Sequence, residues 1–396
     1  MKKNLLFVMP SLSAGGGEKS LVNLLSQIDY KEYNVDLFLF NKTGIFLNSI
    51  PPKVKILELT NNYKDFTTNL KNSLTNFIKD GKWNLAYCRA MFTIKNRLIK
   101  DVALKEQYTW KYKSKSMDNL EKSYDLAIGY LEKSSIYFIV EKVNAKKKIG
   151  WIHTNYSSSG MDPQFDEQYF KHLDQIITVS EECANSLKSQ FPQFNKNISI
   201  IYNIISPQVI NNLSKMEIQE KFARDNDCIT ILTVARLSYE KGLDIAVKSC
   251  KLLVNKGYKL KWYVLGDGNE RENLEKLIES QNLQGNFKLL GVRENPYPYL
   301  RAADIYVQPS RYEGKSIAID EAKVLSKPII VTNFETAKDQ IINEINGLIV
   351  GISEHEVATG IEKMVNNKDL INKFIKNLNQ ERIGNEEEIY KLYDIV

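Results

Sequence analysis

The sequence predicts an α/β protein made of two doubly wound domains with parallel sheets. Three observations support this. A chain of 396 residues exceeds what one hydrophobic core usually organises, apolar β-rich runs alternate with helical segments, and the second half repeats the plan of the first. Runs such as residues 176–179 are apolar at successive positions, which is typical of a parallel strand covered on both faces.

The first half is predicted to hold seven strands, at residues 4–10, 35–40, 54–59, 125–130, 148–153, 175–180 and 198–202. A helix over 18–27 follows the first strand. The strand 198–202 and the turn at Ser206-Pro207 place the end of this domain at residue 205.

The second half, residues 206–380, repeats the alternation. Its strands are expected at 229–235, 260–265, 287–290, 305–308, 328–332 and 348–350. Its helices are expected at 243–255, 271–281, 298–303, 316–325 and 354–366. Residues 381–396 remain for a last helix, in which Ile389, Leu392, Tyr393 and Val396 lie at helical spacing.

Composition limits the class of protein. With 43% hydrophobic and 26% charged residues the chain is ordinary for a globular protein, and no stretch approaches the roughly 20 apolar residues of a membrane span. The N-terminus is too short for a secretory signal, so we expect a cytoplasmic protein. The four cysteines form no CxxC pair, which argues against a zinc site or a disulfide. Abundant Lys, Asn and Ile are typical of an AT-rich bacterial genome.

Two motifs place glycines or cations directly after strands. Gly15, Gly16 and Gly17 let the backbone approach a ligand at a helix N-terminus, which favours anions, although the spacing matches neither a dinucleotide-binding nor a Walker A loop. Arg236 and Lys241 follow a second-half strand and could both reach a diphosphate. A plain turn and a solvated loop are the alternative interpretations.

Two further motifs lie after other second-half strands. Gly266 and Gly268 form a similar turn. A simple β–α connection explains this turn equally well. Glu313 and Glu321 flank seven residues. Their carboxylates could accept hydrogen bonds from hydroxyls, and the amides of Gly314, Lys315 and Ser316 open the predicted helix toward anionic oxygens.

His153 ends an apolar strand of the first half, where a ligand-binding residue of a doubly wound fold would lie. A structural histidine is the alternative. His172 and His355 receive no role.

Together these motifs resemble family 4 of the glycosyltransferases, in which two Rossmann-like domains face each other across a cleft in the GT-B architecture. The resemblance rests on an ordered set of short motifs: Gly15–Gly17, 151–153, 179–180, Arg236-Leu237, 240–242, 266–268, Gly291, 309–310 and 313–321.

The resemblance implies that the first domain, residues 1–205, binds the acceptor, that the second, residues 206–380, binds the nucleotide sugar, and that the last helix, residues 381–396, packs back on the first domain. It also implies a role for each site residue. Arg236 and Lys241 would bind the donor diphosphate and stabilise the leaving group. Glu313 would bind hydroxyls of the transferred sugar, and Glu321 the ribose. The remaining contacts would be Val292 and Arg293 at the base, the Gly15–Gly17 loop over the diphosphate, and His153 at the 6-hydroxyl of the transferred sugar.

The implied reaction is retaining transfer of a hexose or N-acetylhexosamine from a nucleotide sugar, by preference a UDP-sugar, to a lipid-linked or cell-surface glycan. It would need no metal or other cofactor, because fixed cations can stabilise the departing diphosphate. One departure from the family is Lys315 where relatives carry an apolar residue, which adds a cation beside the donor site and leaves the identity of the sugar open.

The net charge of +6 is concentrated in one region. Residues 81–150 contain 15 Lys and Arg against 7 Asp and Glu, a local charge of +8. Within it, residues 91–105 carry apolar side chains at near-helical spacing between cations, and Trp110 and Tyr112 follow. A basic amphipathic helix suits an anionic membrane surface, so we expect peripheral contact through 91–115. An ordinary helix packed on the core is the alternative.

Three other functions stay open. A nucleotide-sugar epimerase or hydrolase would use the same fold, and an inert sugar- or nucleotide-binding subunit would retain it without turnover. Nucleic-acid binding is favoured only by charge and lacks a recognisable motif, so no nucleic-acid partner is expected.

Overall fold

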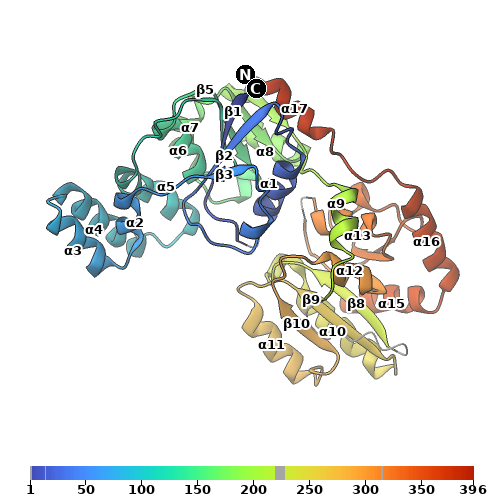
Figure 1. Cartoon of the computed structure of the whole chain (residues 1–396). Coiled ribbons are helices and arrows are strands. Elements are labelled where there is room, and N and C mark those ends of the chain that lie inside the picture. The colour runs from blue at the N-terminus through green and yellow to red at the C-terminus, as the bar shows by residue number, and fades with distance from the viewer. Residues whose placement is uncertain (1, 14, 219–227, 314) are drawn as a thin grey trace. The chain divides into compact units, whose positions relative to one another are not determined.

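The computed structural model describes residues 2–13, 15–218, 228–313 and 315–396, which form two compact units (Figure 1). Unit 1 comprises Met1–Ile204 and Glu387–Val396, and unit 2 comprises Ile205–Glu386. The first division lies one residue before the expected boundary. The return to unit 1 lies later than residue 381, because Asn385 is hydrogen-bonded to both backbone groups of Ile205.

Unit 1 contains one parallel sheet with the order β3-β2-β1-β4-β5-β6-β7. Every strand predicted in this half is present, with ends shifted by three residues or fewer. The strands are β1 (Lys3–Met9), β2 (Tyr33–Leu39), β3 (Val54–Ile56), β4 (Tyr124–Gly129), β5 (Ala145–Ile152), β6 (Gln175–Thr178) and β7 (Ile198–Ile200).

Helices cover both faces of this sheet. On one face α1 (Gly16–Gln27) and α17 (Glu388–Ile395) bury leucines such as Leu21, Leu24 and Leu392 against the strands. The other face is covered by α5 (Val102–Lys113), α6 (Ser134–Lys142), α7 (Pro163–Phe170) and α8 (Glu181–Gln190). The sheet is thus buried on both sides, as the apolar runs predict.

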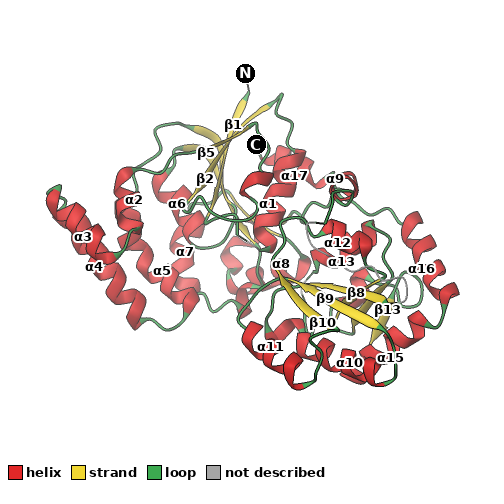
Figure 2. Ribbon diagram, turned by 60° about the horizontal axis from the view of Figure 1, so that its bottom comes forward, coloured by secondary structure: helices red, strands yellow, loops and turns green. Residues whose placement is uncertain are grey.

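Three helices between β3 and β4 form a lobe with its own small core. They are α2 (Asn61–Thr67), α3 (Leu70–Lys79) and α4 (Trp83–Leu98), and Phe66 and Phe77 lie at their centre. Figures 1 and 2 both show α3 and α4 projecting from the sheet of unit 1.

The prediction of a single amphipathic helix over 91–105 is wrong. Helix α4 ends at Leu98, and α5 starts at Val102 because the Asp101 carboxylate accepts hydrogen bonds from two amides of its first turn. Trp110 is buried and its indole N–H donates to Glu141 at 3.0 Å, so this ring is not available to a membrane. No helix in the described part of the chain is long and apolar enough to cross a bilayer.

Unit 2 contains a second parallel sheet with the order β10-β9-β8-β11-β12-β13. All six predicted strands are present: β8 (Ile229–Val234), β9 (Leu260–Leu265), β10 (Phe287–Gly291), β11 (Ile305–Gln308), β12 (Ile329–Thr332) and β13 (Leu348–Val350). The chain winds in opposite directions from β8, which creates a topological switch point between β8 and β11.

Helices also cover both faces of this second sheet, as Figure 2 shows for α10, α11 and α15 on one side and α12 and α13 on the other. One layer consists of α10 (Leu243–Asn255), α11 (Arg271–Ser280), α15 (Glu354–Val365) and α16 (Lys368–Gln380). The other consists of α9 (Pro207–Leu213), α12 (Tyr297–Ala302), α13 (Ile317–Val324) and α14 (Ala337–Gln340).

Candidate functional site

The motif residues of unit 2 converge at the carboxyl ends of its strands, around the switch point. Arg236 and Lys241 follow β8, and Glu313 follows β11, the neighbouring strand. Ligands of open parallel sheets bind in the crevice that forms there. The topology therefore brings together residues that are more than 70 positions apart in the sequence.

Glycines let the connecting loops pack closely. Gly242 has φ of +63°, and a Cβ there would lie 2.0 Å from the carbonyl oxygen of Pro309 in the loop after β11. Gly266 would meet the carbonyl of Ala235 at 1.8 Å, and Gly268 that of Leu237 at 2.3 Å. No side chain fits in these gaps, so the glycine pattern reflects close loop packing around the β8 end.

The Lys241 ammonium lies 2.5 Å from the Glu313 carboxylate. Both side chains are largely buried, with 22% and 7% of their surfaces exposed. For a pair this buried, the cost of removing both charges from water offsets much of the attraction, so a gain in stability is a poor explanation for it. A cation and an acceptor held together at a switch point suit a charged ligand that carries hydroxyl groups.

Two residues without a predicted role hold Glu313 in place. The Gln308 amide and the Ser310 hydroxyl donate to its second oxygen at 3.0 and 2.8 Å. Both are buried at the end of β11, two positions apart and therefore on one face. That spacing after an apolar strand was the sequence signal for them.

Glu321 lies on α13 and is almost fully buried. It accepts a hydrogen bond from the Tyr297 hydroxyl at 2.9 Å. Burial raises the pKa of Tyr306 well above its usual value, and the charges of Glu313 and Glu321 raise it further. The Tyr306 hydroxyl donates to the Gln308 side chain, whose amide donates to Glu313.

The other predicted donor residues take varied positions. Arg236 is exposed at the end of β8. The Arg293 guanidinium lies beside Gly291 and donates to the Val292 carbonyl and to the Tyr299 hydroxyl. Lys315 is paired at 3.8 Å with Asp320.

The anion contacts predicted at the start of α13 stay a prediction. The Ser316 amide donates to the Gln340 side chain at 3.0 Å, so it is not open to an anion in this conformation. Gly314 lies outside the described residues.

In unit 1 the glycine loop and His153 are neighbours. A Cβ at Gly17 would lie 2.9 Å from Leu131 and 3.8 Å from the His153 ring, whereas Gly16 faces open space. The cap residue of α1 is Gly15, and no side chain caps that helix. First-turn amides of a helix favour anions, and here the Glu18 carboxylate lies against Gly15, where a Cβ would meet it at 2.1 Å.

Burial lowers the pKa of His153 to about 3, so the imidazole is neutral near pH 7. Its Nε2 is shielded from solvent yet has no hydrogen-bond partner among the described residues. Buried polar atoms without a partner are rare and costly. This atom is therefore suited to a ligand hydroxyl.

No sequence motif pointed to several other residues around His153. Glu132 accepts hydrogen bonds from the His153 amide and the Thr154 hydroxyl, and burial raises its pKa. The Ser20 hydroxyl joins Tyr130 and Asn203 at 2.8 and 2.6 Å. These contacts fix the loops after β4, β5 and β7 around the first turns of α1.

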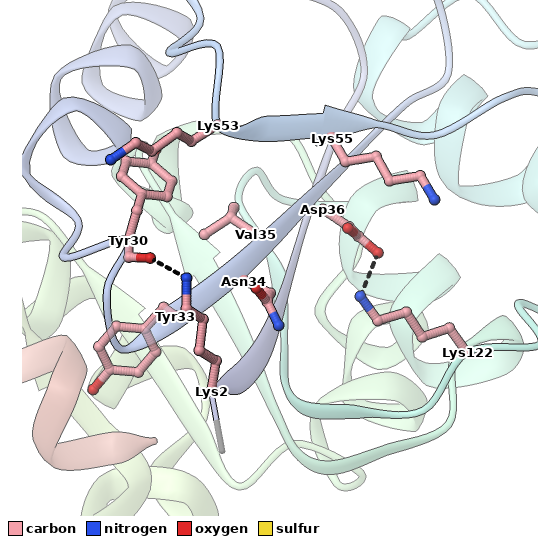
Figure 3. Close-up of a pocket in the computed structure, with 9 residues that line it drawn as sticks. All are labelled: Lys2, Tyr30, Tyr33, Asn34, Val35, Asp36, Lys53, Lys55 and Lys122. Atoms are coloured by element: carbon pink, nitrogen blue, oxygen red, sulfur yellow. Dashed lines mark hydrogen bonds and ion pairs between the residues drawn. The ribbon is translucent and has the colours of Figure 1, made fainter.

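A depression of about 400 Å³ lies at the other end of the unit 1 strands (Figure 3). Lys122 reaches the buried Asp36 at 3.0 Å, and Lys2 donates to the Tyr30 carbonyl at 2.7 Å. The remaining lining residues are Tyr33, Asn34, Val35, Lys53 and Lys55. This basic depression lies at the amino ends of the strands and is distinct from the site residues, which follow the carboxyl ends.

Comparison with known proteins finds a family that the second half of the chain matches. Residues 214–381 match the family model of glycosyl transferases group 1. An uncharacterized glycosyltransferase of Methanocaldococcus jannaschii is 27% identical over 207 residues, which are 50% of this chain and 51% of that protein. A poly(ribitol-phosphate) alpha-N-acetylglucosaminyltransferase of Staphylococcus aureus is 25% identical over 58% of this chain and 45% of its own length. The chain thus spans about half the length of these curated relatives.

Solved structures match over the whole chain. HepE of Anabaena, in complex with UDP-glucose, superimposes with a TM-score of 0.68 at 15% identity and covers 100% of both chains. TarM of Staphylococcus aureus gives 0.63 at 16% identity, covering 99% of this chain and 98% of its own. The predicted GT-B fold is confirmed.

Proposed function

We propose that this chain, whose residues 214–381 match the model of glycosyl transferases group 1, transfers a sugar from a nucleotide sugar to a hydroxyl of a glycan acceptor. The observation that carries the proposal is the Lys241–Glu313 pair at the switch point of unit 2. A nucleotide sugar requires an ammonium to bind its phosphate and a carboxylate to bind its hydroxyls. This pair holds those two groups side by side.

The proposed donor contacts follow from this geometry. Arg236 and Lys241 bind the diphosphate, and the phosphate replaces Glu313 as the partner of Lys241. Glu313 is then available to the hydroxyls of the transferred sugar, while Gln308 and Ser310 keep its carboxylate in position. Glu321 binds the ribose, and Val292 and Arg293 contact the base. UDP is the proposed nucleotide, since HepE, which shares the fold, was solved in complex with UDP-glucose.

The proposed chemistry is transfer with retention at the anomeric carbon. Negative charge develops on the departing diphosphate, and Arg236 and Lys241 are fixed cations that stabilise it without a metal. His153 is neutral and suited to hydrogen-bond a hydroxyl of the transferred sugar rather than to add a charge. The acceptor hydroxyl attacks from the face that the diphosphate leaves, and its proton passes to the leaving phosphate.

The acceptor we propose is a lipid-linked or cell-surface glycan of a bacterium. The Staphylococcus aureus relative is named for transfer of N-acetylglucosamine to poly(ribitol phosphate), which makes a hexose or N-acetylhexosamine and an envelope polymer suitable for this chain.

Proton NMR of the reaction with UDP-glucose and UDP-N-acetylglucosamine in EDTA tests this function. We expect slow release of UDP and a first-formed α-sugar, because water replaces the acceptor on the same face. A β-sugar would contradict retention. A 2-epimer of the donor would favour the epimerase alternative, and bound but unchanged donor the inert subunit.

We also propose that the α2–α5 region contacts an anionic membrane, through part of the expected stretch 91–115 together with residues that precede it. Trp83, Tyr87, Ile94 and Leu98 lie on α4 within an arc of about 60° at 100° per residue. Each is 47–69% exposed, and Val102 at the start of α5 is 75% exposed. Lys79, Arg97 and Lys100 are exposed around this apolar stripe. Large exposed apolar residues among cations suit the boundary between lipid headgroups and acyl chains.

Vesicle flotation tests this contact. The chain should float with phosphatidylglycerol vesicles and less with phosphatidylcholine, since each cation near an anionic surface contributes about 1 kcal/mol. Replacing Lys95, Arg97 and Lys100 by Glu, or Trp83 and Leu98 by Ser, should abolish flotation. Equal flotation of both variants and the unsubstituted chain would contradict the proposal.

A further inference from the structure

The basic depression at the amino ends of the unit 1 strands is lined by four lysines and one carboxylate, that of Asp36 (Figure 3). This carboxylate already has its partners inside unit 1. It accepts a hydrogen bond from the Lys122 ammonium at 3.0 Å and another from the Tyr124 hydroxyl at 2.8 Å. Asp36 therefore neutralises Lys122 and leaves the other three lysines of the depression uncompensated.

Those three, Lys2, Lys53 and Lys55, form what we call the lysine cluster. All are exposed, and none has a carboxylate partner among the residues that the structure describes. Lys2 donates to the Tyr30 carbonyl at 2.7 Å, and the Lys53 ammonium lies 5.7 Å from the centre of the Tyr30 ring. Neither contact removes a positive charge. Because a concave surface lined by one sign of charge concentrates counter-ions, the depression favours an anion.

The position of the lysines in the sheet also indicates a binding site. Lysines on an edge strand keep a sheet from pairing with another chain, which explains Lys53 and Lys55 at the edge strand β3. Lys2 and Lys122 precede β1 and β4, which are central strands, and need another explanation. Three separate segments of the chain thus direct cations to one depression.

The walls of the depression are held in place. The Tyr30 hydroxyl donates to the Leu25 carbonyl at 2.7 Å. The Tyr33 ring stacks on the Tyr393 ring of α17, with 4.8 Å between the ring centres. Side chains that are fixed before binding lose little conformational entropy when a ligand arrives.

The same walls limit the kind of anion. A nucleotide base would need an open aromatic face, whereas Tyr33 is stacked on Tyr393 and Lys53 lies over Tyr30. An acyl chain would need large exposed apolar side chains, and none of the lining residues is one. The depression therefore suits a polar anion better than a nucleotide or a lipid.

The size and the remaining polar group add a second requirement. A volume of about 400 Å³ is in the range of small-molecule sites, and a bare phosphate would fill only a part of it. Asn34 lies between Lys2 and Lys122 in Figure 3. Its side-chain nitrogen donates to Asn4 at 3.2 Å, so its amide oxygen is suited to accept from a ligand hydroxyl.

We propose that this depression binds a small phosphate ester of a polyol, such as glycerol phosphate or a sugar phosphate. Ammoniums of the lysine cluster bind the phosphate oxygens through charge-assisted hydrogen bonds, and Asn34 accepts from a hydroxyl of the polyol. The site is separate from the donor residues, which follow the carboxyl ends of strands in unit 2. It does not depend on the proposed transferase function.

Proton saturation-transfer NMR on the full chain tests this site, with glycerol 3-phosphate as the probe at constant ionic strength. We expect saturation transfer to glycerol 3-phosphate but not to glycerol, and weaker binding of inorganic phosphate as a competitor. The double variant Lys53→Ala, Lys55→Ala should weaken binding by about tenfold or more. The double variant Lys53→Arg, Lys55→Arg keeps both charges and should bind nearly as well as the unsubstituted chain.

The double variant Lys171→Ala, Lys196→Ala is the matched control. These exposed lysines precede β6 and β7, toward the other edge of the same sheet, and their loss changes the net charge equally. Binding should be unchanged in this control and in Lys241→Ala. Equal loss in the control would reduce the effect to general attraction, and loss in Lys241→Ala would move the phosphate to the donor site.

Either result would overturn the proposal, as would absence of saturation transfer to glycerol 3-phosphate. Inorganic phosphate that binds as tightly as the ester would refute recognition of the polyol. Tighter binding of AMP, lost in the Lys53→Ala, Lys55→Ala variant, would show a nucleotide site instead.

Discussion

At the scale of single residues, the site depends on one contact that the sequence does not display. Lys241 and Glu313 were both predicted to touch the donor, but their pairing depends on β8 and β11 being neighbours. Ser310 belongs to the motif 309–310, but neither it nor Gln308 was given a role, because a buried glutamine and a buried serine are common in cores. Their role in holding the Glu313 carboxylate becomes visible only in the structure, where both donate to it.

Loss of either donor cation should slow transfer far more than it weakens folding. Arg236→Ala and Lys241→Ala should each lower kcat by about 10²–10³-fold, as removal of one transition-state charge contact does elsewhere. Initial rates of UDP release measure this. Lys248→Ala removes an exposed lysine of α10 and serves as the control. Near-normal turnover in both variants would refute the phosphate assignment.

His153 should make the folded protein less stable in mild acid. Its pKa is about 3 in the folded chain, against 6.5 for a histidine in water, so below about pH 6.5 the unfolded chain binds the extra proton. The free energy of unfolding therefore falls as the pH decreases toward 3, by at most about 1.4 kcal/mol per unit.

Urea unfolding at pH 7 and pH 5 measures this effect. His153→Gln should lose about 2 kcal/mol less between these two pH values than the unsubstituted chain. The exposed His172→Gln should keep the original pH dependence. The same loss in the His153 variant would contradict the burial of the neutral imidazole.

At the scale of elements, strands were predictable and the α2–α4 lobe was not. Strands such as β1 and β12 show a continuous apolar run, because a parallel sheet buried on both faces demands one. The lobe instead packs a few residues such as Phe66 and Phe77 into a small separate core, and leaves large apolar residues exposed on α4. The apolar spacing across 91–105 therefore gave no sign of the break at Asp101, where a cap starts a new helix.

The turn at Gly242 should tolerate no side chain. Gly242→Ala imposes a left-handed backbone on a residue with a Cβ, at about 1–2 kcal/mol, and drives that Cβ into the Pro309 carbonyl. We expect lower thermal stability and weaker donor binding, since Lys241 is adjacent. Gly285→Ala, where a Cβ would meet no atom within 4 Å, should be nearly neutral in both measurements. Equal effects of the two substitutions would contradict the close loop packing.

At the scale of the whole molecule, the two-domain plan was predictable because each half repeats strand and helix periods on its own. The last helix was expected from Ile389, Leu392, Tyr393 and Val396 alone, and α17 does bury Ile389 and Leu392 in the core of unit 1. The point of return was less predictable, since the Asn385–Ile205 contact keeps the preceding segment on unit 2. Closure of the Gly15–Gly17 loop over a donor held by unit 2 stays a prediction.

The central claim is that Arg236, Lys241 and Glu313 form a nucleotide-sugar site. A thermal-shift screen of UDP-, GDP-, ADP- and dTDP-sugars in EDTA tests it most directly. We predict that one nucleotide class, UDP, raises the melting temperature, and that Arg236→Ala and Lys241→Ala abolish the shift. Absence of a shift with every donor, or an undiminished shift in both variants, would contradict the claim.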